Sequence, residues 1–322
     1  MKILVIGGAG YIGSHFILEA LKIGHDITVF DDLSSGFNSN LDKNIPFFKG
    51  STLVVQDLLR VMKIQKFDIV VYLAAFKAAG ESMSNPAKYT SNNIMGGLNL
   101  IKACVDNNIE KILFSSSAAV YGTPKYTPID ESHPLKPINY YGYTKLLIEE
   151  NLQWYSKLKG LKFASLRYFN AAGYDSDHKF LNIEKNPQNL IPIVMECASG
   201  IRENLEVFGN DYSTTDGTGI RDYIHVSDLA RGHLDSIDYL LNNDKNLILN
   251  LGTGKGISVL EVIKATEKIS NKKINYNISN RREGDPDVVI ASAKKAEKII
   301  NWSPRKSDLK TIIGSTWKMY NR

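Results

Sequence analysis

Cysteine is scarce in this sequence of 322 residues. Its two cysteines, Cys104 and Cys197, lack metal-ligand spacing, so we expect no metal site and a reducing compartment. No apolar run reaches the ~20 residues that span a bilayer. The apolar stretch at residues 3–6 breaks into glycines too soon for a signal peptide. We therefore expect a cytoplasmic protein without a membrane partner.

The sequence also lacks an excess of charge of one sign. It has 39 Lys and Arg against 34 Asp and Glu, which gives a net charge of +5, and the lysines are scattered among acids. No basic run with interleaved aromatic residues occurs, so we expect no nucleic-acid partner. We find no internal repeat and no low-complexity linker. The length allows one large domain or two smaller ones.

Short apolar runs alternate with helical patterns in the first half of the chain. We expect strands at 3–6, 27–30, 46–49, 68–74, 111–115 and 163–167, and helices at 12–23, 53–64, 92–107 and 141–159. Continuous apolar strands separated by helices are typical of a parallel sheet that is covered on both faces. The sequence therefore predicts an α/β protein with a doubly wound, Rossmann-type parallel sheet.

A glycine turn marks the first strand-to-helix junction. Gly7, Gly10 and Gly13 satisfy GxxGxxG, and Gly8, Gly10 and Gly13 satisfy GxGxxG. Such a turn lets the backbone approach a pyrophosphate, which rests on the free N–H groups that open a helix, here at Tyr11 and Ile12. A tight turn without a ligand is the alternative.

Asp31 follows the second predicted strand, 18 residues past Gly13. A carboxylate there can accept both ribose hydroxyls of an adenosine and repel a 2′-phosphate. Asp32 adds a second negative charge, and no Arg or Lys occurs between Asp31 and Lys43. The sequence therefore predicts NAD rather than NADP, with loop capping by Asp31 as the alternative.

The second half of the chain predicts a different organisation. After about Gly173 the pattern becomes irregular and is rich in Asn, Gly and Asp loops. We expect a NAD-binding Rossmann domain over residues 1–173, with a return segment around 225–251. Residues 174–322 are expected to form a smaller α/β domain that binds the substrate.

Tyr-x-x-x-Lys is the clearest catalytic pattern, because residues four apart share one face of a helix. The ammonium then lowers the tyrosine pKa from its ordinary ~10 and makes a usable base. Three copies occur, at Tyr121/Lys125, Tyr141/Lys145 and Tyr155/Lys159. Pro124 interrupts the first, and the third lies near the far end of its helix. Tyr141 and Lys145 open a helix and are our candidates.

Three serines end the predicted strand at 111–115. Ser117 lies 24 residues before Tyr141, and its hydroxyl can both donate and accept a proton between a substrate and the tyrosine. Loop capping is the alternative role.

The glycine turn, Ser117, Tyr141 and Lys145 resemble the extended short-chain dehydrogenase/reductase superfamily. Longer segments are similar to the UDP-glucose 4-epimerase family, and the resemblance runs from Met1 to about Trp302. These segments are Phe76–Ser82, Ser115–Gly122, Arg167–Gly173, Gly217–Val226 and Arg281–Asp285.

The resemblance implies an isomerase that interconverts UDP-galactose and UDP-glucose. NAD would stay bound, Tyr141 would take the proton of the sugar 4-hydroxyl, and the 4-keto sugar would turn about its diphosphate link before hydride returns. Lys145 would tune Tyr141, and Ser117 would hydrogen-bond the reacting oxygen. The family also implies a homodimer.

The resemblance further implies two sets of contact residues. The cofactor set comprises Gly7, Gly10, Tyr11, Ile12, Gly13, Asp31, Leu73, Lys77, Asn92, Ser117, Tyr141, Lys145 and Phe169. The UDP-hexose set comprises Lys77, Ser117, Tyr141, Asn170, Asn189, Leu190, Phe208, Arg221, Arg282, Asp285 and Val289. Arginine forks suit a diphosphate, and an aromatic face suits uracil. A surface ion pair with Asp222 or Asp228 is the alternative for Arg221.

Two positions depart from the family pattern. Ser51 stands where an Asp commonly contacts adenine, so adenine affinity is expected to be weaker. Val289 stands where some members carry a tyrosine that narrows the sugar pocket, so N-acetylated UDP-sugars (UDP-GlcNAc and UDP-GalNAc) are expected to fit as well.

Three other functions stay open at this point. The first is a nucleotide-sugar 4,6-dehydratase or decarboxylase. Dehydratases usually have an Asp-Glu pair beside the serine or threonine, but here the stretch reads Ser117-Ala118-Ala119. A non-catalytic NAD-binding regulator often loses the tyrosine or the lysine, and both are present. An ordinary dehydrogenase would release NADH.

Overall fold

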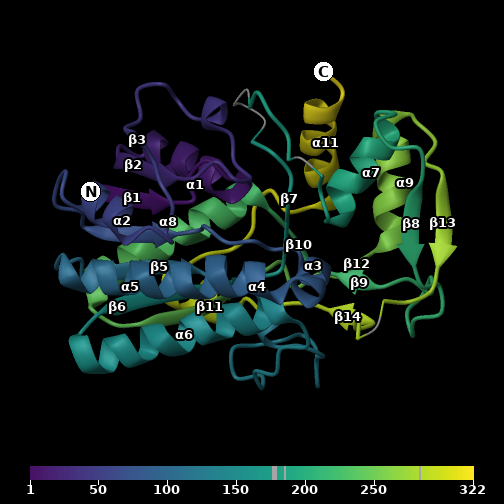
Figure 1. The fold of residues 1–322 in the computed structure, drawn as a ribbon. Coiled ribbons are helices and arrows are strands. Elements are labelled where there is room, and N and C mark those ends of the chain that lie inside the picture. Colours follow the sequence, from purple (N-terminus) through teal and green to yellow (C-terminus); the bar gives the residue numbers. More distant parts are fainter. Residues whose placement is uncertain (176–179, 185, 283) are drawn as a thin grey trace. The chain divides into compact units, whose positions relative to one another are not determined.

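The computed structural model describes residues 1–175, 180–184, 186–282 and 284–322 (Figure 1). The chain divides into two compact units. Unit 1 comprises Met1–Gly122, Pro134–Arg167 and Ala230–Leu249, and unit 2 comprises Thr123–His133, Tyr168–Leu229 and Asn250–Arg322. The domain boundaries expected from the sequence stay a prediction.

A seven-stranded sheet with the order β11-β6-β5-β4-β1-β2-β3 forms the centre of unit 1. Its strands are β1 (Lys2–Ile6), β2 (Asp26–Asp31), β3 (Phe47–Lys49), β4 (Ile69–Tyr72), β5 (Lys111–Ser115), β6 (Lys162–Tyr168) and β11 (Leu247–Leu251). All neighbours from β6 to β3 pair in parallel. The prediction of a doubly wound parallel sheet is confirmed. The order reverses between β1 and β4, where the carboxyl ends of the strands provide a binding site in such folds.

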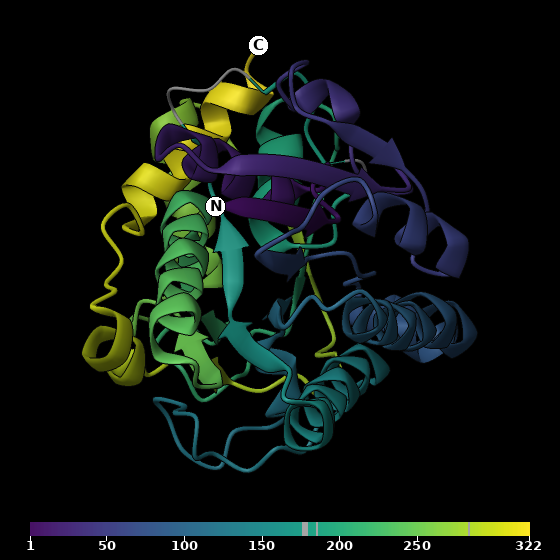
Figure 2. The same ribbon diagram turned by 90° about the vertical axis from the view of Figure 1, so that its left-hand side faces the viewer.

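Helices cover both faces of this sheet. They are α1 (Tyr11–Lys22), α2 (Val55–Met62), α3 (Ala79–Ser84), α4 (Pro86–Tyr89), α5 (Gly96–Asp106), α6 (Tyr140–Lys159) and α8 (Val226–Asn243), with short helical turns η1 (Asn38–Asn40), η2 (Thr90–Met95) and η3 (Ala118–Val120). In Figure 2, α5 (blue) and α6 (teal) lie on one side of the sheet and α8 (green) lies on the other.

The core of unit 1 follows from strand alternation, because successive side chains point to opposite faces. Leu4 and Ile6 of β1 belong to one buried cluster with Leu58 of α2, Leu100 of α5 and Ile148 of α6. On the α1 and α8 side, the Phe16 and His233 rings pack with centroids 6.0 Å apart.

The predicted boundaries of several elements differ from the observed ones. A helix was expected at 92–107, but the chain forms the π-helical turn η2 over Thr90–Met95 before α5 begins at Gly96. The helix expected from residue 53 begins at Val55. Residues 51–54 form a tight turn instead, in which the backbone N–H groups of residues 53 and 54 donate hydrogen bonds to Ser51.

The described residues of unit 2 form three small sheets. They pair β10 (Tyr223–His225) with β7 (Asn170–Ala172), β12 (Ile257–Ser258) with β9 (Ile220–Arg221) and β14 (Val288–Val289), and β13 (Tyr276–Ser279) with β8 (Leu205–Phe208). Its helices include α7 (Leu190–Ala198), α9 (Val259–Ser270), α10 (Lys294–Ile300) and α11 (Leu309–Tyr320). Helices α7, α9 and α11 pack against one another. Among the residues described in the two units, no helix has the length and apolar character to cross a membrane.

Candidate functional site

The glycine turn joins β1 to α1 as predicted. Gly10 precedes the helix without a side-chain cap, so the first N–H groups of α1 meet no capping side chain. A Cβ on Gly13 would lie 2.4 Å from the carbonyl oxygen of Gly7 and 2.7 Å from the Cα of Gly8. Only glycine permits this close approach. The cradle therefore has the form that a pyrophosphate at a helix N-terminus requires.

Asp31 ends β2 beside this turn and is 8% exposed. Its carboxylate accepts hydrogen bonds from the backbone N–H groups of Ala9 (2.9 Å) and Leu33 (2.8 Å). Burial raises the pKa of Asp31, and these two bonds act in the opposite direction. The carboxylate thus helps hold the loop of the glycine turn, as well as standing where a ribose is expected.

Ser51 follows β3, where its hydroxyl accepts a hydrogen bond from the Leu53 N–H (3.3 Å). Its own N–H donates to the Asp57 carboxylate (3.2 Å). The hydroxyl therefore serves the local turn, which fits the expectation of a weaker adenine contact at this position.

The segment after β4 carries three predicted contact residues. The backbone N–H of Leu73 donates to the Ile6 carbonyl (2.9 Å), which places it beside the glycine turn. The Lys77 ammonium lies 5.9 Å from the centroid of the Tyr11 ring, so these two candidates lie close together. Asn92 lies on η2, and its side-chain amide donates to Asn93 (3.1 Å).

Asn93 is a functional candidate that the sequence analysis missed. It is buried, and its amide group both accepts from the Phe76 N–H and donates to the Phe76 carbonyl, each at 2.9 Å. It also donates to the Thr144 hydroxyl of α6 (3.2 Å). Two adjacent asparagines on a π-helical turn, a feature frequent at functional sites, could have indicated it.

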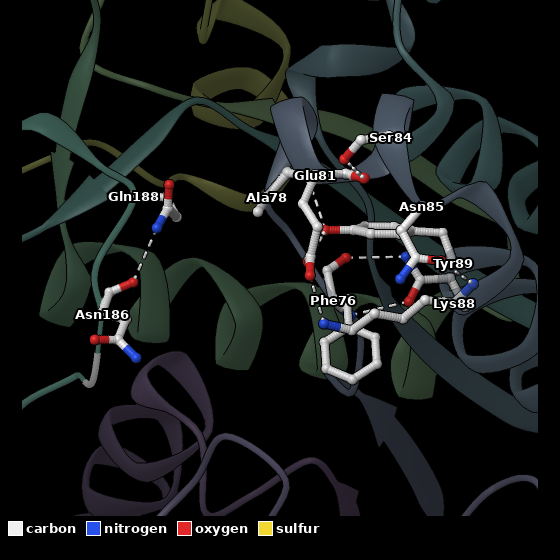
Figure 3. A network of polar contacts seen from close by, with 10 residues as sticks. Phe76, Ala78, Glu81, Ser84, Asn85, Lys88, Tyr89, Asn186 and Gln188 are labelled. Carbon is white, nitrogen blue, oxygen red and sulfur yellow. Dashed lines mark hydrogen bonds and ion pairs between the residues drawn. The ribbon is translucent and has the colours of Figure 1, made fainter.

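A second network fixes the chain around Lys77 (Figure 3). The buried Tyr89 hydroxyl donates to the Ala78 carbonyl (2.7 Å) and to the Glu81 carboxylate (3.0 Å). Lys88 pairs with Glu81 at 2.7 Å, and its ammonium lies 4.2 Å from the centroid of the Phe76 ring. Both neighbours of Lys77 in the chain are therefore held in place.

Tyr141 lies in the first turn of α6, which is capped by the side chain of Asn139. Its backbone N–H donates to the Ser82 hydroxyl (3.0 Å), and its phenol is hydrogen-bonded to Ser117. A Cβ on Gly142 would lie 2.4 Å from the Ala119 carbonyl oxygen, so glycine lets the helix approach the turn that carries Ser117. The structure brings these two predicted residues together.

The electrostatics of Tyr141 differ from the sequence-based expectation. Burial raises the pKa of its phenol, and the hydrogen bond with Ser117 acts in the opposite direction. Lys145 was expected to lower this pKa, but its ammonium lies 5.8 Å from the centroid of the Tyr141 ring. Instead it donates to the Ser115 carbonyl (2.7 Å). Desolvation therefore outweighs stabilisation of the phenolate.

Lys145 is 4% exposed. Burial lowers its pKa to about 7, and the carboxylate of Glu149, one turn further along α6, acts in the opposite direction. A lysine with a pKa in this range changes charge near neutral pH, as is common at functional sites.

The other two Tyr-x-x-x-Lys pairs occupy different surroundings. Tyr121 is buried after η3, whereas Lys125 belongs to unit 2, so no helix carries the pair. Tyr155 and Lys159 lie in the last part of α6, where Lys159 is exposed.

In unit 2, three predicted substrate residues lie together. Arg221 of β9 is in register with Val289 of β14, and its guanidinium forms an ion pair with Asp285. The alternative partners Asp222 and Asp228 bond elsewhere: the Asp222 carboxylate accepts from the Thr253 hydroxyl (2.7 Å). The Asp228 carboxylate accepts from the Ser307 hydroxyl (2.6 Å).

Phe208 and Arg282 form a second group. The Arg282 guanidinium lies 3.9 Å from the centroid of the Phe208 ring, a cation–π contact. The Asp285 N–H donates to the Arg282 carbonyl (3.2 Å), which links this group to the first. Two arginines and an aromatic ring thus gather in one part of unit 2.

The remaining predicted residues lie at element ends of unit 2. Phe169 is buried, and Asn170 begins β7, where its N–H donates to the Asp222 carbonyl (3.0 Å). Asn189 precedes α7 and Leu190 is the first residue of that helix. The binding roles of all these residues stay predictions.

Comparison with known proteins places these features in context. The model of the NAD dependent epimerase/dehydratase family matches residues 3–252. A curated UDP-glucose 4-epimerase of Lactobacillus helveticus is 39% identical over 323 residues, which cover 99% of this chain and 97% of that protein.

Solved structures agree with this relationship. The UDP-glucose 4-epimerase of Brucella ovis in complex with NAD has a TM-score of 0.96 and 38% identity, covering 99% of this chain and 98% of that one. The UDP-Glc/GlcNAc 4-epimerase of Campylobacter jejuni has a TM-score of 0.87 and 40% identity, covering 99% of both chains. The family expected from the sequence is confirmed, and so is NAD as the cofactor of that family.

Proposed function

The chain belongs to the NAD dependent epimerase/dehydratase family, and we propose that it interconverts UDP-galactose and UDP-glucose by inverting carbon 4 of the sugar. The observation that carries this proposal is the hydrogen-bonded pair of Tyr141 and Ser117 at the start of α6, with Lys145 one turn later. Relatives named UDP-glucose 4-epimerase, matched over nearly the whole chain, support this reaction among those of the family.

The residues of unit 1 fit NAD, because Gly13 leaves the space that a Cβ would fill and α1 opens without a capping side chain. The glycine turn would hold the pyrophosphate and Asp31 the adenosine ribose. Lys145 would hold the nicotinamide ribose. When bound, NAD accepts a hydride from sugar carbon 4 and returns it, and we propose that it stays bound through turnover.

The proton is handled by this chain's own residues. Tyr141 takes the proton of the sugar 4-hydroxyl while the C4–H bond breaks, and Ser117 hydrogen-bonds the reacting oxygen. The resulting 4-keto sugar turns about its diphosphate link and presents its other face. Tyr141 then returns the proton to the same oxygen after hydride has reached carbon 4, so the proton balance of the cycle is zero.

Unit 2 is proposed to bind the nucleotide. Arg221 and Arg282 supply two guanidinium forks for the diphosphate, and Phe208 supplies a face for uracil. Arg221 is already paired with Asp285, so the diphosphate must compete with that carboxylate. Asn170, Asn189, Leu190, Asp285 and Val289 complete the proposed contacts of unit 2.

Two further expectations are kept as proposals. The family resemblance supports a homodimer, and the scarcity of cysteine supports a cytoplasmic location.

The test is incubation of the purified protein with UDP-galactose without added cofactor, followed by separation of the sugar nucleotides. Conversion to UDP-glucose without net NADH supports the proposal. Net NADH would indicate a dehydrogenase, and loss of water or carbon dioxide from a nucleotide sugar would indicate a dehydratase or decarboxylase. Binding of NAD without conversion of UDP-galactose, UDP-glucose or UDP-GlcNAc would indicate a regulator.

A further inference from the structure

A buried ion pair lies beneath the proposed catalytic residues. The Arg167 guanidinium of β6 donates from Nε to Glu149 Oε1 (3.0 Å) and from Nη2 to Glu149 Oε2 (2.5 Å). The Arg167 side chain is 3% exposed and the Glu149 side chain 0%. Neither residue was expected from the sequence, although a charged residue inside the apolar strand predicted at 163–167 needs a buried partner.

Two hydroxyl groups complete this network. The Ser116 hydroxyl donates to Glu149 Oε1 (2.5 Å), and Arg167 Nη1 donates to the Tyr121 hydroxyl (3.1 Å). Ser116 is 0% exposed and Tyr121 is 1% exposed. The four residues come from β6, α6 and the two ends of the turn that contains η3. The network therefore ties α6 to that turn.

The geometry connects the network to the candidate residues on both sides. Ser116 stands between Ser115, whose carbonyl accepts the Lys145 ammonium (2.7 Å), and Ser117, which is hydrogen-bonded to Tyr141. Glu149 follows Lys145 by one helical turn and Tyr141 by two, so the three share one face of α6.

Stability alone is a poor explanation for a buried ion pair. Replacing such a pair by apolar residues of similar volume is often neutral or even stabilising. The Glu149 carboxylate of this pair also accepts the Ser116 hydroxyl, so the pair holds the residue that lies between Ser115 and Ser117. This arrangement fits a role in fixing the position of Ser116 and its neighbours better than a role in stabilising the fold.

We propose that Glu149 and Arg167, acting through Ser116, are positioning residues that set the placement of Ser117 and of the Ser115 carbonyl relative to Tyr141 and Lys145. None of the four network residues belongs to the proposed set of substrate contacts. This inference rests on the proposed function, because the reaction that it serves is the proton transfer by Tyr141.

The first variant is Ser116→Ala, which removes one hydroxyl and leaves the ion pair intact. Its matched control is Ser236→Ala, since Ser236 is also 0% exposed and donates one hydrogen bond, to the Gly232 carbonyl (2.7 Å) on α8. Displacement of catalytic groups by roughly 1 Å can cost about 10²-fold in rate. We expect kcat of Ser116→Ala to fall about 10- to 100-fold. The KM and the urea midpoint should stay close to those of the control.

The second variant separates stability from positioning. Glu149→Leu combined with Arg167→Met replaces the ion pair by apolar side chains, which should preserve the fold. Ser116 then has no carboxylate to bind. We expect a folded protein whose kcat is lowered at least as much as that of Ser116→Ala.

The wild-type assay distinguishes failure of this inference from failure of the proposed function. If the wild type epimerises UDP-galactose but Ser116→Ala loses no more kcat than Ser236→Ala, the positioning role is overturned. If the wild type converts no UDP-hexose, the proposed function fails, and hydrogen exchange of residues 115–119 decides instead. Faster exchange in Ser116→Ala than in Ser236→Ala supports positioning of this turn, and equal exchange overturns it.

Discussion

At the scale of single residues, Tyr141 and Lys145 sit in surroundings that push both toward the neutral form. Burial raises the pKa of Tyr141 and lowers that of Lys145 to about 7. A neutral tyrosine beside Ser117 can still exchange a proton with a substrate hydroxyl, but its action as a base requires the phenolate to be stabilised. The approach of a cation to the phenol would supply this stabilisation.

The first prediction concerns the proposed acid–base group. Tyr141→Phe removes the hydroxyl and keeps the ring, and loss of one positioned acid–base group typically costs about 10²- to 10⁴-fold in rate. We expect turnover of UDP-galactose to fall by this factor while the dissociation constant for UDP changes little. Steady-state kinetics measures the turnover, and calorimetry measures the dissociation constant for UDP. Tyr143→Phe is the control, since Tyr143 is exposed on the same helix; near-normal turnover in Tyr141→Phe would assign the base elsewhere.

The second prediction concerns the size of the sugar pocket. Val289 is smaller than tyrosine, so the wild type is expected to accept UDP-GlcNAc, and Val289→Tyr is expected to exclude it while keeping UDP-galactose. The measurement is the ratio of kcat/KM for the two substrates in each protein. If both proteins exclude UDP-GlcNAc equally, Val289 does not determine whether the pocket accepts an N-acetylated sugar.

At the scale of elements, two helices begin where glycine allows a close backbone approach. Near the start of α1, Gly13 packs against the Gly7 carbonyl, and near the start of α6, Gly142 packs against the Ala119 carbonyl. These contacts place α1 against the glycine turn and α6 against the turn that carries Ser117. Both helices can approach so closely because glycine has no Cβ.

The third prediction tests these two close backbone contacts. Gly13→Ala and Gly142→Ala each place a Cβ 2.4 Å from a carbonyl oxygen, so the backbone must shift. We expect Gly13→Ala to lose NAD and Gly142→Ala to lower kcat, both with reduced stability. Gly314→Ala, inside α11 with open space around its Cβ, is the control and should stabilise by about 0.5–1 kcal/mol. Chemical denaturation measures the stability of each variant, and the content of bound NAD measures cofactor binding. An unchanged NAD content in Gly13→Ala would argue against NAD binding at the glycine turn.

The fourth prediction concerns β10 and the acid stability of the protein. His225 is buried and neutral, accepting from the Ser227 N–H (3.1 Å) and contacting the Ser315 hydroxyl (3.2 Å). Burial lowers its pKa from 6.5 to about 4, so its stabilising contribution is complete above about pH 6.5 and is lost as the pH falls toward 4.

This loss amounts to on the order of 3 kcal/mol, because each pKa unit corresponds to about 1.4 kcal/mol. Urea unfolding across this pH range should show a steeper decline for the wild type than for His225→Gln, which cannot take up the proton. Parallel declines in the two proteins would exclude His225 as the titrating group.

At the scale of the whole molecule, ligand binding and folding are linked. A ligand that binds only the folded protein raises the free energy of unfolding by about 2.7 kcal/mol at 100 times its dissociation constant. The fifth prediction is that NAD raises the melting temperature more than NADP at equal concentration, because Asp31 repels a 2′-phosphate. Asp31→Asn should narrow the difference. Equal stabilisation of the wild type by both cofactors would show that Asp31 does not discriminate.

The two units differ in how far their organisation could be predicted. In unit 1 the strands and helices follow from apolar periodicity, so the parallel sheet and the placement of Ser117 after β5 were predictable. In unit 2 the strands are two to four residues long, and β8 pairs with β13 across about 70 residues of sequence. Such short strands carry too few residues for a periodicity, and their pairing depends on contacts between distant segments.

The family, the fold class and the positions of Gly13, Asp31, Ser117, Tyr141 and Lys145 could be predicted from the sequence, because glycine turns, strand ends and four-residue helical spacing are local patterns. The groups that surround these residues could be identified only in the folded protein. The Glu149–Arg167 pair, the role of Asn93 and the upward shift of the Tyr141 pKa all depend on burial and on partners far away in the sequence. Desolvation and side-chain pairing are set by the packed interior, which no local pattern contains.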